Sequence, residues 1–176
     1  MPKVFTMQVG KWRLAKDHDI KIMDTTVKSG YSIFAPTWDM VLGHKNGSMD
    51  DDTYSRLYRD MLVKSWKENR QKWMDFLQSD DQFALACYCK AGVFCHRHLL
   101  VKFLNQLCKQ LGIPFEYYGE LTDEPLPENP HPVSQHDPSP DPRSGGQRPE
   151  RQPAAGDGGT DHGQSSGDSG AAGGSG

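Results

Sequence analysis

The chain has 176 residues, enough for one domain of ordinary size. All 17 aromatic residues lie at or before Tyr118, whereas residues 123–176 hold 11 of the 18 Gly and 9 of the 12 Pro. A segment with so little to bury does not recover the entropy cost of folding. We therefore predict one folded domain over residues 1–122 and a disordered Gly-, Pro- and Ser-rich tail over residues 123–176.

The charge also changes at this boundary. Residues 1–122 hold 17 Lys and Arg against 14 Asp and Glu, and the acidic tail holds 3 against 9. So small a positive surplus, with no run of Lys or Arg, is weak evidence for a nucleic-acid groove and leaves a small anionic ligand open. No segment has the length and apolarity of a membrane span, and the first residues lack the pattern of a signal peptide. We expect a cytoplasmic protein with no membrane contact.

The first half of the chain begins with two predicted strands. Residues 3–9 alternate in polarity up to Gly10, and residues 20–27 are rich in β-branched side chains. Residues 31–47 contain Pro36, Gly43 and Gly47 between aromatic residues, a pattern typical of a long functional loop. Residues 50–77 contain neither Gly nor Pro and carry apolar residues at helical spacing, which predicts two helices with a bend near Glu68.

The second half predicts a strand, a helix and a last strand. Residues 83–89 form a continuous apolar run, typical of a strand buried on both faces. Leucines at helical spacing then predict a helix that stops at Gly112, and residues 115–118 predict a short strand. Helical segments between strands favour a three-layer α/β fold with a mostly parallel sheet.

The chemistry is concentrated between the third strand and the last helix, in residues 87–98, which include Cys89, Gly92, Cys95, His96 and Arg97. Ligands of open α/β sheets bind at the carboxyl ends of strands, and the free N–H groups of a helix N-terminus favour an anion there. We expect Cys95 in the first helical turn, where the helix dipole and Arg97 favour a thiolate. Seven residues separate Cys89 from Arg97, which excludes the five-residue spacing of the phosphatase loop.

The triplet Cys95-His96-Arg97, placed after a strand that ends in cysteine and before a Leu-rich helix, resembles the signature of the domain-of-unknown-function 488 family of bacterial and phage proteins. Asp24, the aromatic loop from Tyr31 to Trp38, and the closing Tyr118-Gly119-Glu120 stand in the expected order. The resemblance covers about residues 3–121 and implies a Rossmann-like domain without an established activity. Family members commonly carry Arg soon after the aspartate of the second strand, and here Thr25-Thr26-Val27-Lys28 follows Asp24.

We predict one site for an anionic, nucleotide-like small molecule. Cys95 is the expected nucleophile and His96 the expected acid or base. Arg97 would clamp the anion, with Cys89 and Gly92 in the same loop. Two residues complete the predicted site: Asp24, which either caps its own loop or faces Arg97, and Trp38, whose loop would form a partial lid.

Two alternatives remain open. The first is a binding module without catalysis that recognises a nucleotide or nucleic acid. The second is a small zinc protein. Its metal ligands would come from the following residues: Cys87, Cys89, Cys95, and either His96 or His98. Their chemistry suits zinc, but the Cys-x-Cys spacing is not the usual one, so we predict no metal ligand, and the sequence identifies no cofactor. Cys87 and Cys108 are expected to pack in the core.

Overall fold

The computed structural model describes residues 2–133. Its centre is a four-stranded sheet in the order β2-β3-β1-β4, in which every neighbouring pair is parallel. The strands are β1 (Lys3–Gln8), β2 (Lys21–Asp24), β3 (Gln82–Cys87) and β4 (Glu116–Glu120). The predicted α/β class and parallel sheet are confirmed.

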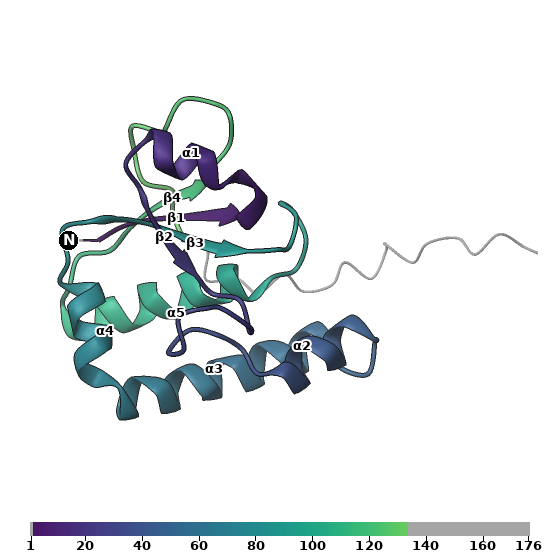
Figure 1. Cartoon of the computed structure of the whole chain (residues 1–176). Coiled ribbons are helices and arrows are strands. Elements are labelled where there is room, and N and C mark those ends of the chain that lie inside the picture. The colour runs from purple at the N-terminus through teal and green to yellow at the C-terminus, as the bar shows by residue number, and fades with distance from the viewer. Residues whose placement is uncertain (1, 134–176) are drawn as a thin grey trace, which may run out of the picture. The chain divides into compact units, whose positions relative to one another are not determined.

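The helices cover the two faces of the sheet unequally. Figure 1 shows α1 (Trp12–Asp17) on one face and all the others on the opposite face. These others are α2 (Trp38–Lys45), α3 (Asp51–Glu68), α4 (Arg70–Leu77) and α5 (His96–Leu111). A short 3-10 helix, Val9–Lys11, joins β1 to α1. The predicted helical break is confirmed, because α3 ends before Asn69 and α4 begins after it.

Two helices differ from the sequence prediction. Residues 31–47 were predicted as a loop, and this is wrong for Trp38–Lys45, which form α2. Thr37 caps this helix by accepting a hydrogen bond from the Met40 amide. The helix α1 was not predicted at all. Both helices are short, so neither has room to repeat an apolar face, and Gly43 lies inside α2.

The larger core lies between the sheet and the helices α3, α4 and α5. Trp73, Tyr58, Phe34 and Leu104 are fully buried there, and Phe34 meets Trp73 edge to face with ring centroids 4.8 Å apart. Tyr58 donates a 2.6 Å hydrogen bond to the Phe34 carbonyl oxygen, so the loop before α2 is fastened to α3. This packing fixes the position of α5, whose N-terminus carries the predicted chemistry.

A second, smaller core lies beneath α1 and includes Phe5, Ala15 and Leu121. Leu126 packs against it, and Val133 packs against the larger core. Residues 123–133 contain no helix or strand. The rest of the predicted disordered tail, residues 134–176, lies outside the described residues.

Candidate functional site

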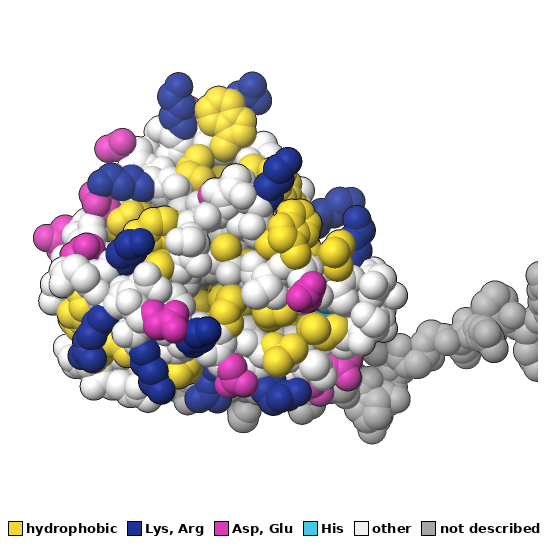
Figure 2. Space-filling model, turned by 60° about the horizontal axis from the view of Figure 1, so that its bottom comes forward, with side chains coloured by type: hydrophobic (Ala, Val, Ile, Leu, Met, Phe, Trp, Pro, Cys, Tyr) yellow, Lys and Arg dark blue, Asp and Glu magenta, His cyan; other side chains and the backbone are white. Residues whose placement is uncertain are grey.

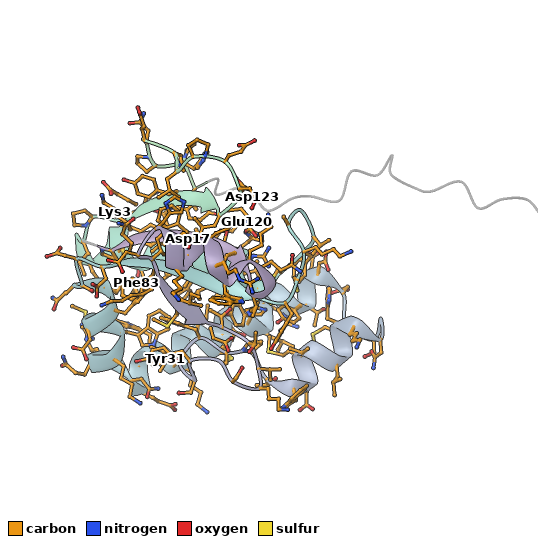
Figure 3. The ribbon with its side chains drawn as sticks, turned by 45° about the horizontal axis from the view of Figure 1, so that its top comes forward. Lys3, Asp17, Tyr31, Phe83, Glu120 and Asp123 are labelled. Atoms are coloured by element: carbon orange, nitrogen blue, oxygen red, sulfur yellow. The ribbon has the colours of Figure 1, made fainter. Side chains whose placement is uncertain are left out.

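The site lies at the carboxyl edge of the parallel sheet, where three strands end near the N-terminus of α5. Cys87 is the last residue of β3, Thr25 follows β2, and Glu120 ends β4. Figure 3 labels Glu120 at this end of the sheet. Because parallel strands direct all their carboxyl ends to one edge, residues far apart in sequence meet there.

Three cysteine sulfurs converge at this edge. The Sγ atoms of Cys87, Cys89 and Cys95 all lie within 4.8 Å of one another, and those of Cys87 and Cys89 are 3.6 Å apart. Cys87 and Cys95 are buried, whereas Cys89 is partly exposed. All four cysteines of the chain are free thiols. The predicted strand continued to Cys89, but it ends at Cys87, so the chain turns and brings the two sulfurs together.

Hydrogen bonds within the cluster distribute the negative charge unequally. Hydrogen bonds from Cys87 and Cys95, together with the charge of Arg97, hold the pKa of the Cys89 thiol far below its usual range. The pKa of the Cys95 thiol is raised, because it makes hydrogen bonds with Cys87 and Cys89 that favour its protonated form and because it is buried. These shifts favour the thiolate form at Cys89 over Cys95.

His96 is held in one tautomer. Its Nε2 lies 2.9 Å from the Thr25 carbonyl oxygen, which can only accept a hydrogen bond, so Nε2 carries the proton and donates. The Thr25 hydroxyl donates to the Ala86 carbonyl oxygen and lies 3.1 Å from the same Nε2. In the neutral ring, Nδ1 is therefore the nitrogen with the free lone pair. It faces the Sγ atoms of Cys87 and Cys95 at 4.0 and 3.9 Å.

Arg97 is fully buried and binds the chain itself. One terminal nitrogen donates to the Cys89 carbonyl oxygen at 2.9 Å and lies 3.5 Å from Cys95 Sγ. The other donates to the Lys90 carbonyl oxygen at 3.2 Å and to the carboxylate of Glu120 at 3.1 Å. Only Nε has no hydrogen-bond partner among the described residues. The terminal nitrogens of Arg97, which were expected to clamp an anion, thus bind the loop after β3 and Glu120.

Asp24 follows the first of the two alternatives predicted for it. Its carboxylate accepts hydrogen bonds from the Thr26 amide at 2.8 Å and from the Ser29 hydroxyl at 2.7 Å. Partial burial raises the pKa of Asp24, but these hydrogen bonds outweigh it and lower the pKa. Asp24 therefore caps its own loop, and the carboxylate that faces Arg97 belongs to Glu120.

Of the remaining predicted residues, Gly92 and Cys95 lie at the site, whereas Trp38 makes no contact with the cysteines that the structure records. Gly92 lies in the loop of the site with φ +77°, a backbone conformation that favours glycine, and Cys95 is the N-cap of α5 rather than a residue of its first turn. Trp38 is half exposed at the start of α2, and no hydrogen bond or ring contact within residues 2–133 joins it to the cysteines.

An aromatic group that the sequence did not reveal closes the site on the helical side. Phe94 stacks on His44 of α2, with centroids 4.8 Å apart, and meets Tyr54 of α3 edge to face. Tyr58 lies against the ring of His96, with centroids 5.6 Å apart. Through these ring contacts α2 and α3 pack against Phe94 and His96, the residues before and after Cys95. Tyr54 and Tyr58 are buried, whereas His44 and Phe94 are partly exposed.

The fold is that of an α/β protein whose parallel strands end beside a cysteine cluster and the N-terminus of α5, at the edge where open α/β sheets bind ligands. The family model described as the Active DUF488-N3 subclade matches residues 9–107. The chain belongs to this family. The match includes Cys87, Cys89, Cys95, His96 and Arg97 and ends before Glu120.

Comparisons with curated proteins and with solved structures give no match. Among the described residues, no helix combines the length and the hydropathy that crossing a membrane requires.

Proposed function

We propose that this chain is a cysteine-dependent enzyme acting on a small anionic, nucleotide-like molecule at the carboxyl edge of the sheet. The observation that carries the proposal is the position of Cys89: it is the one partly exposed thiol of a cluster that otherwise lies buried. A nucleophile must be reached by its substrate, and the thiols of Cys87 and Cys95 are covered. We therefore assign the reacting thiol to Cys89 in place of Cys95.

Two features support an anionic substrate with an aromatic part. The buried guanidinium of Arg97, which is paired with Glu120, donates a hydrogen bond to the carbonyl oxygen of the partly exposed Cys89 and so places positive charge beside this residue. Tyr88 and Val93, in the same loop, are 68% and 48% exposed and offer apolar surface beside it. Figure 2 shows further hydrophobic side chains exposed among charged ones on the face it turns forward. The description of the matched subclade as active agrees with an enzyme.

His96 would assist as a base through Nδ1, the nitrogen that lacks a proton. Nδ1 lies close to the thiols of Cys87 and Cys95, which donate hydrogen bonds to the Cys89 thiolate, so it would exchange protons with the groups that hold this thiolate. This arrangement differs from a direct Cys-His pair. It assigns Cys87 a part in this proton exchange as well as in packing.

The test is a screen for nucleotide turnover and nucleotide-dependent thermal stabilisation, with Cys89→Ser beside the wild type. A ligand that binds only the folded state must raise its melting temperature. We expect turnover in the wild type, its loss in Cys89→Ser, and stabilisation in both. Cys108→Ser, which changes a buried thiol of α5 outside the cluster, is the matched control.

A non-catalytic binding module is the second candidate. The observation that favours it is the engagement of Arg97 by the chain, which leaves the site fewer free polar groups than an enzyme usually presents. It predicts stabilisation by a nucleotide without turnover in the wild type. Absence of both turnover and stabilisation would contradict both candidates.

A further inference from the structure

The cluster at the carboxyl edge has four donor atoms of the kind that zinc selects. Three are the sulfurs of Cys87, Cys89 and Cys95, which lie within 4.8 Å of one another. The fourth is Nδ1 of His96, at 4.0 Å from Cys87 Sγ and 3.9 Å from Cys95 Sγ. Sulfur and imidazole nitrogen bind zinc at about 2.3 and 2.1 Å, so the ligand atoms of a tetrahedral site are separated by about 3.5–3.8 Å. The 3.6 Å between the Cys87 and Cys89 sulfurs and the 4.0 and 3.9 Å from Nδ1 to the Cys87 and Cys95 sulfurs are close to these values, and binding of an ion would draw the remaining pairs together.

The hydrogen bond of His96 is the independent observation that points to a ligand. Histidines that bind metals commonly donate the other ring N–H to a carbonyl or a carboxylate, which fixes the ring and directs the free lone pair at the ion. Here Nε2 donates to the Thr25 carbonyl oxygen, and His96 is 6% exposed. The buried Nδ1 therefore faces the cysteine cluster, and the partners that residues 2–133 offer it are the sulfurs of Cys87 and Cys95 at 4.0 and 3.9 Å.

Arg97 places a positive charge beside the cluster, which it shares with the carboxylate of Glu120 at 3.1 Å. Three thiolates and one zinc ion leave a net charge of −1 on the four ligands, and a buried charge is tolerated only when it is compensated. The guanidinium of Arg97 lies 3.5 Å from Cys95 Sγ, and it also holds the backbone of Cys89 in place. Its contacts thus orient two of the ligands.

We propose that Cys87, Cys89, Cys95 and Nδ1 of His96 bind one zinc ion per chain in a tetrahedral Cys3His site. Cys87, Cys95 and His96 are the buried ligands, and Cys89 is the ligand nearest to solvent. The inference goes beyond the proposed function and does not depend on it, although both use Cys89. They are compatible because a thiolate is both the form that binds a metal and the form that reacts.

The test is a titration of the reduced, metal-free full chain with Co²⁺, which replaces zinc and absorbs visibly when tetrahedral. We expect one ion per chain, with thiolate-to-cobalt charge-transfer bands in the near ultraviolet, and displacement of cobalt by zinc. Cys87→Ser and Cys95→Ser should abolish these bands or weaken binding at least about 100-fold, and His96→Gln should shift the visible bands. Cys108→Ser, outside the cluster, should titrate like the wild type.

Cys89→Ser keeps the test decisive if the buried variants fail to fold, because this residue lies in a partly exposed loop. It should fold, weaken cobalt binding and lose charge-transfer intensity. Absence of a charge-transfer band in the folded wild type, or titration curves for Cys89→Ser equal to those of the wild type, would overturn the zinc site. Zinc binding without nucleotide turnover would contradict the proposed enzyme alone, and turnover in a protein that binds no metal would contradict this inference alone.

Discussion

At the scale of single residues, Arg97 shows how a correct motif can have a different role from the expected one. The sequence places a guanidinium at a helix N-terminus, where it is suited to clamp an anion. The structure buries it completely and gives its terminal nitrogens to two carbonyl oxygens and to Glu120. Glu120 is separated from Arg97 by 23 positions in the sequence, and only the parallel arrangement of β4 brings the two together.

We predict that Arg97→Lys lowers the free energy of unfolding by about 2 kcal/mol, because lysine keeps the charge but loses the planar set of donors and leaves Glu120 poorly paired. Denaturant unfolding measures the change. Arg59→Lys, on the exposed side of α3, is the matched control and should change stability by less than about 0.5 kcal/mol. Equal stability of the two variants would show that the contacts of Arg97 carry little energy.

Asp24 makes a prediction about pH. Its pKa is lowered in the folded protein by hydrogen bonds from Ser29 and Thr26, which outweigh the effect of burial. A carboxyl whose folded pKa lies below the unfolded value of about 3.9 stabilises the protein above that value, and this stabilisation is lost as the pH falls through the folded pKa. Asp24→Ala should therefore cost about 1 kcal/mol at neutral pH and progressively less below about pH 4.

Urea unfolding of the wild type and Asp24→Ala at several pH values between about 3 and 7 checks this prediction. Asp60→Ala, at an exposed position of α3, is the matched control. A gap between wild type and Asp24→Ala that stays constant down to the lowest pH would contradict the capping role.

At the scale of elements, the strands and the longer helices could be predicted because their patterns repeat. The run in β3 and the leucine spacing of α5 each extend over enough residues to show one burial pattern. The helices α1 and α2 are only 6 and 8 residues long, and tertiary packing rather than periodicity holds them. How closely the sulfurs of Cys87 and Cys89 approach could not be predicted for a related reason: it depends on where β3 ends, and the ends of elements are weakly marked in sequence.

The end of α5 offers a matched pair of glycine substitutions. Gly112 caps the helix with φ +66°, and a Cβ there would meet nothing within 4 Å. Gly10 also has open space but no left-handed backbone conformation. Gly112→Ala should therefore destabilise the protein by about 1 kcal/mol through backbone strain alone, and Gly10→Ala should not. The melting temperatures of both variants measure this difference, and equal values would contradict the role of Gly112 as the helix cap.

At the scale of the whole molecule, the composition of the chain changes at residue 123, but residues beyond this point still pack against the domain. Leu126 and Val133 contact the cores, and the His131 amide donates to the Tyr117 carbonyl oxygen at the edge of β4. These contacts join sparse apolar residues to strands distant in sequence, so composition alone does not reveal them. The site has the same property: its cysteine, histidine and arginine come from one segment, whereas Thr25 and Glu120 come from two others.

We predict that a chain ending at Val133 melts at the temperature of the full chain, because residues 134–176 contain no aromatic residue and are dominated by Gly, Pro and Ser. A chain ending at Thr122 should melt several degrees lower, since losing about 1 kcal/mol of packing shifts the melting temperature of a domain of this size by about 4 °C or more. Calorimetry of the three chains measures this. Equal melting of the two truncated chains would show that Leu126 and Val133 contribute nothing.

The central claim is that Cys89 is the reacting thiol of a ligand site formed at the carboxyl edge of the sheet. The most direct measurement is the rate at which each cysteine of the folded, reduced, metal-free protein is alkylated by iodoacetamide, mapped by peptide mass spectrometry with and without nucleotides. We predict that Cys89 is modified first, that Cys108, which is buried and whose pKa is raised to about 11, is modified last, and that a bound nucleotide slows modification of Cys89. Modification of Cys95 or Cys108 ahead of Cys89, or no protection of Cys89 by any nucleotide, would contradict the claim.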